Sequence, residues 1–205
     1  VTEHDKTVEH GRINALQGKI VRPQDGSVRA NLFTQFGVSE QSTDLKLGTS
    51  STKVRDKVLE AVEKSEDALG DAAYTDHVAL LGANLFRQFI EHPTVKEAFK
   101  YTASGPVAGD VRSGFEFGGV TWMRYRGPAA FLSPDEGRMV PRGVAEFLQT
   151  VYSPADFMET VGEVGRPRYA KQERMKHDRG INLHTQSRPL SYCTKPDALV
   201  KLTTS

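Results

Sequence analysis

Residues 153–172 read SPADFMETVGEVGRPRYAKQ and combine carboxylates, basic side chains and two prolines in one short span. Such a mixture is compatible with an active site, a nucleic-acid-binding surface or a structural junction. The residues inside this stretch and around it decide between the three interpretations.

Two carboxylates of this stretch, Asp156 and Glu159, are candidates for an acid and base pair. Residues three apart are neighbours on a helix, so one carboxyl group could donate a proton while the other accepts one. The local pattern favours a structural role, because Ser153 and Pro154 resemble the start of a helix with Asp156 near its positive end. We therefore expect caps, and a hydrolase is the remote alternative.

A basic run follows the carboxylates and encloses one aromatic residue, Tyr169. This is a weak signal for nucleic-acid binding, since single-strand binding uses several aromatic platforms along a groove. We expect a solvated or subunit-facing strand instead. The run consists of Arg166, Arg168, Lys171, Arg174 and Lys176.

Composition excludes several classes of protein. The chain of 205 residues has 27 Lys and Arg against 26 Asp and Glu, so no global field would hold DNA or an anionic membrane. Its longest apolar run, near residues 78–81, is far shorter than the roughly 20 residues that span a bilayer. We expect no membrane partner.

The single cysteine, Cys193, cannot form an internal disulfide and fits a reducing compartment. We expect it to be a half-buried packing residue. The six histidines lack the spacing that puts two metal ligands on one helix face, and the glycines of residues 105–119 do not match a phosphate-binding loop. The sequence therefore predicts neither a metal nor a cofactor.

Periodicity predicts a helix over residues 2–17 that ends at Gly18, and then a hairpin that turns at Asp25-Gly26. A polar linker is expected over 39–51. A second helix begins near Thr52, with Ser or Thr to cap it, and ends at Gly70.

The middle of the chain predicts an α/β layer. A buried strand at 77–82 precedes a helix that stops at His92-Pro93, and one more helical piece follows at 94–102. Residues 106–114 are expected to form a loop, and a hairpin turns at Gly118-Gly119 with Trp122 or its neighbours facing a core.

Extended segments dominate the rest of the chain, at residues 137–143, 146–154 and 180–203. Pro189 and Pro196 are expected to break the last of these. The order of elements allows both ends of the chain to form one lobe while the middle forms another.

Ordered motifs across the chain resemble the lambda-type phage major capsid protein family, the major head protein E family. The similar stretches are LQGKI (16–20), FEFGGV (115–120), YRG (125–127), YSPADFMETV (152–161), GRPRYAKQ (165–172), QSRPL (186–190), CT (193–194) and PDALV (196–200).

The resemblance implies an α+β chain with the Hong Kong 97 capsid fold, in which a peripheral lobe holds the end of a spine helix and a β-sheet. Residues 1–48 and 162–205 would form this peripheral lobe, and residues 49–161 an axial α/β lobe. The opening stretch then becomes a lobe junction and subunit contact. Its residues are Pro154, Asp156, Glu159, Gly165, Arg166, Pro167, Arg168 and Tyr169.

The function that the resemblance implies is structural and not enzymatic. Subunits would assemble as hexamers and pentamers into an icosahedral head around double-stranded DNA, in the host cytoplasm and then in the virion. Expected partners are scaffold, portal and decoration proteins, with non-specific contact to packaged DNA.

Two points qualify this expectation. Family chains carry an arm, an extended loop and most of the spine helix before the region matched here, so we expect this 205-residue chain to fold without building shells; capsids seen by electron microscopy would refute that. An encapsulin-like compartment that encloses cargo enzymes is the main alternative, and a neighbouring gene for a terminase or for a cargo enzyme would separate the two.

Overall fold

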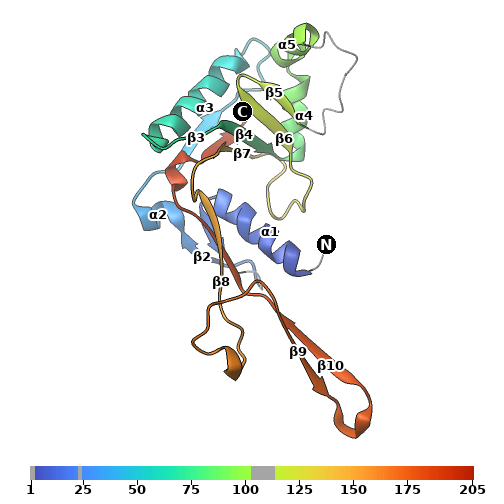
Figure 1. The fold of residues 1–205 in the computed structure, drawn as a ribbon. Coiled ribbons are helices and arrows are strands. Elements are labelled where there is room, and N and C mark those ends of the chain that lie inside the picture. The colour runs from blue at the N-terminus through green and yellow to red at the C-terminus, as the bar shows by residue number, and fades with distance from the viewer. Residues whose placement is uncertain (1–2, 23–24, 103–113) are drawn as a thin grey trace.

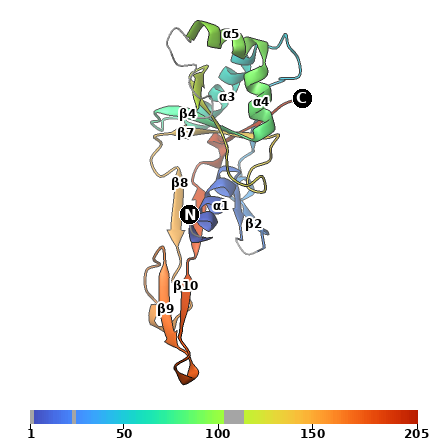
Figure 2. The same ribbon diagram turned by 90° about the vertical axis from the view of Figure 1, so that its right-hand side faces the viewer.

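A computed structural model describes residues 3–22, 25–102 and 114–205 of the chain, which has an α+β fold. Figure 1 shows a body of sheet and helices at one end and a long two-stranded ribbon at the other, with helix α1 between them. In the perpendicular view of Figure 2 the ribbon again extends away from the body.

A six-stranded mixed sheet forms the centre of the body, in the order β3-β12-β7-β4-β6-β5. Strand β12 is parallel to β3 and β4 is parallel to β6, whereas the remaining neighbours are antiparallel. The strands are β3 (Gln41–Asp44), β4 (Asp76–Leu81), β5 (Phe115–Phe117), β6 (Val120–Arg124), β7 (Gly137–Arg142) and β12 (Val200–Thr203).

Helices α3 (Val54–Leu69), α4 (Ala83–Glu91) and α5 (Pro93–Thr102) complete the body. The apolar faces of α3 and α4 pack with sheet residues into one core that includes Val58, Phe89, Trp122, Met139 and Leu202. Burial of these side chains is the main force that holds the helices on the sheet.

A second apolar cluster joins the body to helices α1 and α2 and to strand β11. Leu16 at the end of α1 (Glu3–Leu16) and Leu32 at the start of α2 (Leu32–Phe36) pack with Phe147, Cys193 and Leu199. Beside them lie the hairpin β1 (Lys19–Val21) and β2 (Val28–Asn31), and the antiparallel pair β8 (Leu148–Tyr152) and β11 (Pro189–Cys193).

Gly18 makes the junction between α1 and β1 possible. Its φ of 68° is in the left-handed region that glycine adopts without cost. A Cβ atom at this position would lie 2.1 Å from the Phe33 ring, so the backbone also passes too close to that ring for any side chain.

Strands β9 (Tyr169–Arg174) and β10 (Ile181–Gln186) form the projecting antiparallel ribbon. Short 3-10 turns η2 (Met158–Thr160), η3 (Lys176–Asp178) and η4 (Pro196–Ala198) connect the extended segments. Every residue of β9 except Tyr169 is exposed, as expected for a strand outside the core.

Most predicted helices and strands are confirmed, including the hairpins at Asp25-Gly26 and Gly118-Gly119. The linker prediction for 39–51 was wrong in part, because β3 forms there by pairing with β12. The cap prediction for α3 was also wrong, since Lys53 occupies the N-cap without a side-chain hydrogen bond. The predicted interruptions of the segment 180–203 are confirmed, because β10 ends at Gln186 shortly before Pro189 begins β11, and Pro196 begins the turn η4. The predicted loop lies outside the described residues except for Gly114.

Candidate functional site

The opening stretch forms a strap, residues 153–168, that links β8 to the ribbon β9–β10. The strap folds back on the base of the ribbon, where Phe157 contacts the His184 ring at 5.7 Å between ring centroids. Figure 1 shows the strap beside the ribbon rather than on the body. All the site residues predicted from sequence lie in the strap, except Tyr169, which begins β9.

Asp156 fixes the strap to β10 and to the segment that follows it. Its carboxylate accepts a hydrogen bond from Gln186 Nε2 and lies 3.0 Å from the Arg188 guanidinium. Its backbone N–H donates to Gln186 Oε1 at 3.2 Å. The hydrogen bond from Gln186 lowers the pKa of the Asp156 carboxyl, and the positive charge of Arg188 adds to this effect.

A second attachment joins the strap to β9. Glu159 forms an ion pair with Lys171, whose Nζ also lies 5.2 Å from the centre of the Phe157 ring. Phe157 is thus held between Lys171 on β9 and His184 on β10. The strap therefore covers one face of the ribbon at its base.

The helix-cap prediction for residues 153–156 was wrong. The helical turn of the strap is η2, whose N-cap is Phe157, and Asp156 points to Gln186 and Arg188 instead of to a helix end. The Thr160 hydroxyl donates to the carbonyl groups of Ala155 and Phe157, at 2.7 and 2.9 Å, and so organises this turn.

The geometry does not assemble Asp156 and Glu159 into an acid and base pair. Asp156 forms an ion pair with Arg188, whereas Glu159 forms an ion pair with Lys171. Both side chains are exposed to solvent, at 57% and 71%. The hydrolase hypothesis thus has no shared site between these two groups.

Acidic side chains neutralise much of the basic run. Arg168 pairs with Asp5 of α1, Lys171 pairs with Glu159, and Arg166 lies 3.9 Å from Glu163. The Tyr169 hydroxyl accepts a hydrogen bond from the Arg166 backbone N–H at 2.9 Å. A run that is engaged in this way is a poor match for a groove that follows a nucleic-acid backbone.

Gly165 and Pro167 shape the crossing from strap to ribbon. A Cβ atom at Gly165 would lie 1.9 Å from the Tyr152 carbonyl oxygen, so this close approach of two backbones requires glycine. The Pro167 carbonyl accepts a hydrogen bond from Ser187 Oγ at 2.8 Å, which joins the start of β9 to the end of β10 at the base of the ribbon.

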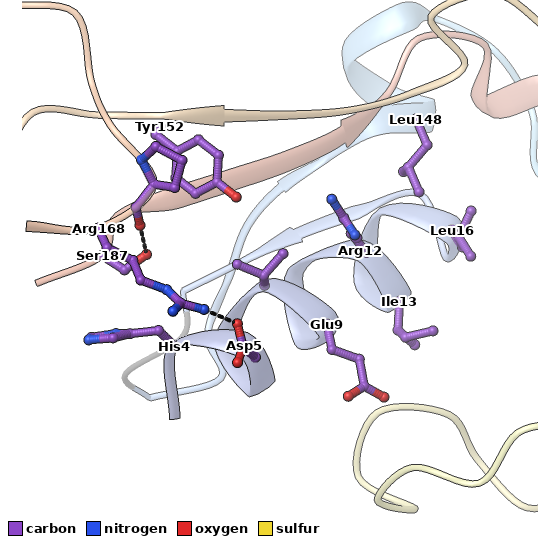
Figure 3. Close-up of a pocket in the computed structure, with 12 residues that line it drawn as sticks. His4, Asp5, Glu9, Arg12, Ile13, Leu16, Leu148, Tyr152, Arg168 and Ser187 are labelled. Atoms are coloured by element: carbon purple, nitrogen blue, oxygen red, sulfur yellow. Dashed lines mark hydrogen bonds and ion pairs between the residues drawn. The ribbon is translucent and has the colours of Figure 1, made fainter. Parts of the chain in front are cut away.

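A groove of 540 Å³ opens between α1 and β8, beside the base of the ribbon (Figure 3). Side chains of Val8, Arg12 and Leu16 from α1 form one wall, and Leu148 and Tyr152 of β8 form the other. Figure 3 also shows the Arg168 guanidinium paired with Asp5 at one end. The groove thus combines an apolar lining with one charged end.

Two further predictions concern cysteine and metals. The packing role predicted for Cys193 is confirmed, but the side chain is fully buried rather than half-buried, and this burial raises the pKa of the thiol to about 12. No group of three or more His, Cys, Asp or Glu side chains suited to a metal ion occurs among the residues described. In the same part of the chain, none of the helices combines the length and apolar character needed to cross a bilayer.

A family model described as phage major capsid protein E matches residues 1–204. The chain belongs to this capsid protein family. The major capsid protein of Pseudomonas phage KPP10 is 28% identical over 97% of this chain, and that of Salmonella phage Felix O1 is 24% identical over 97%. The chain spans 64% of the length of each relative.

Solved capsid structures share the fold of this member of the capsid E family. A prophage capsid protein from E. coli CFT073 is 16% identical, with a TM-score of 0.61 over 98% of this chain and 63% of the other. The capsid of cyanophage P-SCSP1u is 10% identical, with a TM-score of 0.51 over 97% and 61%. The predicted α+β, Hong Kong 97-like fold is thereby confirmed.

The partners of the strap were missing from the sequence-based prediction. Asp5, Gln186, Ser187 and Arg188 hold the strap and the ribbon in place, yet they lie far from 153–168 in the sequence. No local pattern pairs Asp5 with Arg168, because their proximity depends on how α1 packs against the β8–β11 pair.

Proposed function

We propose that this chain is a structural subunit of an icosahedral phage or prophage head that self-assembles around double-stranded DNA. The observation that carries the proposal is the projecting ribbon with its strap. Among the described residues, the five large apolar side chains that are more than 60% exposed all lie there: Met158, Val161, Val164, Ile181 and Leu183. Such a surface is typical of a protein interface.

In this proposal the strap residues Pro154 to Tyr169 form the lobe junction and a subunit contact. The ion pairs of Asp156, Glu159 and Arg168 hold the β9–β10 ribbon in one orientation. Gly165 and Pro167 set the direction in which the ribbon leaves the body. Arg166 lies at the same crossing, beside Tyr169. The role of all these residues is therefore positional and not catalytic.

The two-lobe arrangement is part of the same proposal. The axial lobe would centre on the six-stranded sheet and the peripheral lobe on α1, β8, β11 and the ribbon. Strands β3 and β12 pair within the sheet, which favours assigning residues 41–44 and 200–203 to the axial lobe rather than to the peripheral segments 1–48 and 162–205.

The partners follow from the proposed role. Copies of the chain would form hexamers and pentamers, with scaffold, portal and decoration proteins and non-specific contact to packaged DNA, first in the host cytoplasm and then in the virion. The relation to major capsid proteins of two phages supports a DNA-filled head over an encapsulin-like compartment.

Assembly of the complete product of the open reading frame that contains this sequence tests the proposal. The product is purified, sedimented through a gradient and viewed by negative-stain electron microscopy, and closed shells are expected. Ser substitutions at Met158 and Val161 should reduce the yield of shells while the secondary structure stays the same. A product that remains monomeric at every concentration and ionic strength contradicts the proposal.

A further inference from the structure

Strand β8 has one paired edge and one edge that no described strand covers. The Ser153 N–H donates to the Arg188 carbonyl, and the Thr194 N–H to the Phe147 carbonyl, both at 3.0 Å. Hydrogen-bonded pairs alternate along an antiparallel ladder. Residues 147, 149, 151 and 153 therefore face β11, and the backbone groups of Leu148, Thr150 and Tyr152 point to the other edge. The Gly165 backbone lies against the Tyr152 carbonyl, so the free part of this edge is formed by Leu148 and Thr150.

The groove lies where an additional strand beside β8 would place its side chains. Leu148 and Tyr152 line it from the strand, and Val8, Arg12 and Leu16 line it from the helix. A strand that pairs with β8 would continue the β8–β11 sheet over α1, so that alternate side chains enter the groove. Strand addition between an edge strand and a helix is a known mode of peptide recognition.

We propose that this edge and groove accept strand β10 from a second copy of the chain. The added strand extends the β8–β11 sheet across the contact between two subunits. This inference rests on the proposed function, because it names one contact by which the subunits associate.

Strand β10 provides a matching edge. The Met175 N–H donates to the Gly180 carbonyl at 2.9 Å, which fixes the alternation of the ladder in the ribbon. The backbone groups of Ile181, Leu183 and Thr185 consequently point away from β9. Residues of β10 can therefore bond to Leu148 and Thr150 of the other copy.

Among the described residues, none covers the face of the ribbon that carries Ile181 and Leu183. These side chains are 65% and 71% exposed and lie on the same face of the strand, because their positions differ by two. The strap attaches to the opposite face through Phe157 and His184. Docking on β8 would place both aliphatic side chains against the apolar lining of the groove.

The exposed side chains of β10 favour a second copy of the chain over DNA as the occupant. Four of the seven Lys and Arg residues of 166–188 are paired with carboxylates of the same chain: Arg166, Arg168, Lys171 and Arg188. The exposed aliphatic side chains of Ile181 and Leu183 match an apolar groove rather than a phosphate backbone.

The contact joins different surfaces of the two copies, so it is heterologous. Each copy that donates β10 keeps an open β8 edge, and each copy that accepts keeps an open ribbon. Contacts of this kind form rings or continue into larger assemblies. Such contacts also cover exposed strand edges, which could otherwise pair with other chains and cause aggregation.

Substitution of Thr150 tests the contact. Thr150→Pro removes the outward N–H but no ladder bond to β11, and Thr150→Val is its matched control. Both variants lose the hydroxyl that contacts Arg12 and Ser191, at 3.2 and 3.0 Å. Each variant is made in the complete product of the open reading frame that contains this sequence. Thr150→Pro is expected to lower the yield of shells at least tenfold, while Thr150→Val assembles normally. Equal assembly by both variants overturns the strand contact and leaves the proposed function intact.

Amide hydrogen exchange gives a second measurement that does not depend on the folding of a variant. In assembled protein the amides of 148–152 and 181–186 should exchange at least tenfold more slowly than in dissociated protein. Exchange that is unchanged by assembly overturns the contact. If no shells form, the proposed function fails, and exchange at rising protein concentration then decides: protection supports the contact and constant rates overturn it. Protection of 181–186 by added DNA alone identifies nucleic acid as the occupant and also overturns it.

Discussion

Phe89 on α4 and Trp122 on β6 stack with ring centroids 4.0 Å apart and ring planes at 22°. Both side chains are fully buried, and the indole N–H of Trp122 donates to the Phe117 carbonyl at 2.9 Å. Phe115 and Phe117 surround Phe89 at 5.9 and 5.8 Å, so one aromatic cluster fixes α4 against the edge hairpin of the sheet.

Phe89→Ala should destabilise the body strongly. Removing this ring leaves a cavity beside Trp122, and comparable substitutions cost about 3–5 kcal/mol. Urea unfolding followed by tryptophan fluorescence measures the change. Phe36→Ala is the control, because the Phe36 side chain is 51% exposed, and we expect less than about 1 kcal/mol. Similar losses in both variants would contradict the assignment of the core.

His77 makes the stability of the body depend on pH. Its side chain is 3% exposed, and its Nε2 lies 3.2 Å from Ser65 Oγ, which donates to the Ala198 carbonyl at 2.8 Å. Burial lowers the pKa of His77, and the charges of Glu66 and Asp76 oppose this only in part. The folded protein therefore binds the proton more weakly than the unfolded chain.

Stability should fall as the pH drops below about 6.5, the pKa of histidine in the unfolded chain, towards the lower folded pKa. The contribution of one such group is at most about 1.4 kcal/mol per pH unit. Urea midpoints at pH 7.5 and 5.5 measure it, and His77→Gln should lose less stability between these two values than the unsubstituted protein. An identical loss in both proteins would mean that His77 does not titrate differently in the folded state.

The elements predicted correctly are those whose signal is local. The end of α3 at Gly70 and the turn at Gly118-Gly119 depend on the positive φ angles that glycine allows. Two or three neighbouring residues are enough to predict such a feature. Strand β3 was missed because QSTD is polar and becomes a strand only through its parallel pairing with β12. Because β12 lies near the other end of the chain, the local pattern of residues 41–44 does not indicate this pairing.

A long-range contact also explains why the role of Asp156 in the strap was predicted wrongly. Sequence located the strap and indicated a junction, but it predicted that Asp156 caps a helix. In the folded chain β10 brings Gln186 to Asp156, and Arg188 follows close behind it. A carboxylate with these partners does not need a helix end, so the error reflects a long-range contact that outweighs a local preference.

Asp156→Asn should loosen the strap without affecting the body. Exposed ion pairs contribute about 0–1 kcal/mol, so the free energy of global unfolding should stay within about 0.5 kcal/mol. Limited proteolysis should nevertheless cut within 157–164 several times faster. Glu163→Gln is the matched control, because Glu163 lies 3.9 Å from Arg166 within the strap itself and does not attach it to the ribbon. Equal rates of cleavage in both variants would show that Asp156 does not hold the strap.

Gly165→Ala should displace the crossing between strap and ribbon. The new Cβ atom would lie 1.9 Å from the Tyr152 carbonyl oxygen, and since both atoms belong to backbone segments, neither can rotate away. Overpacking of this kind costs about 1–3 kcal/mol, and the strap should respond by separating from the end of β8.

Gly162→Asn separates this close contact from a general effect of replacing glycine in the strap. Gly162 has a φ of 80°, a Cβ atom added there would meet no described atom within 4 Å, and asparagine tolerates left-handed backbone. We expect it to change stability by only a few tenths of a kcal/mol. Thermal unfolding measures both variants, and exchange of the Ser153 amide, which bonds to Arg188, reports locally on the crossing. A Gly165→Ala protein as stable as Gly162→Asn, with the Ser153 amide equally protected, would show that the strap moves without cost and that its direction is not fixed by Gly165.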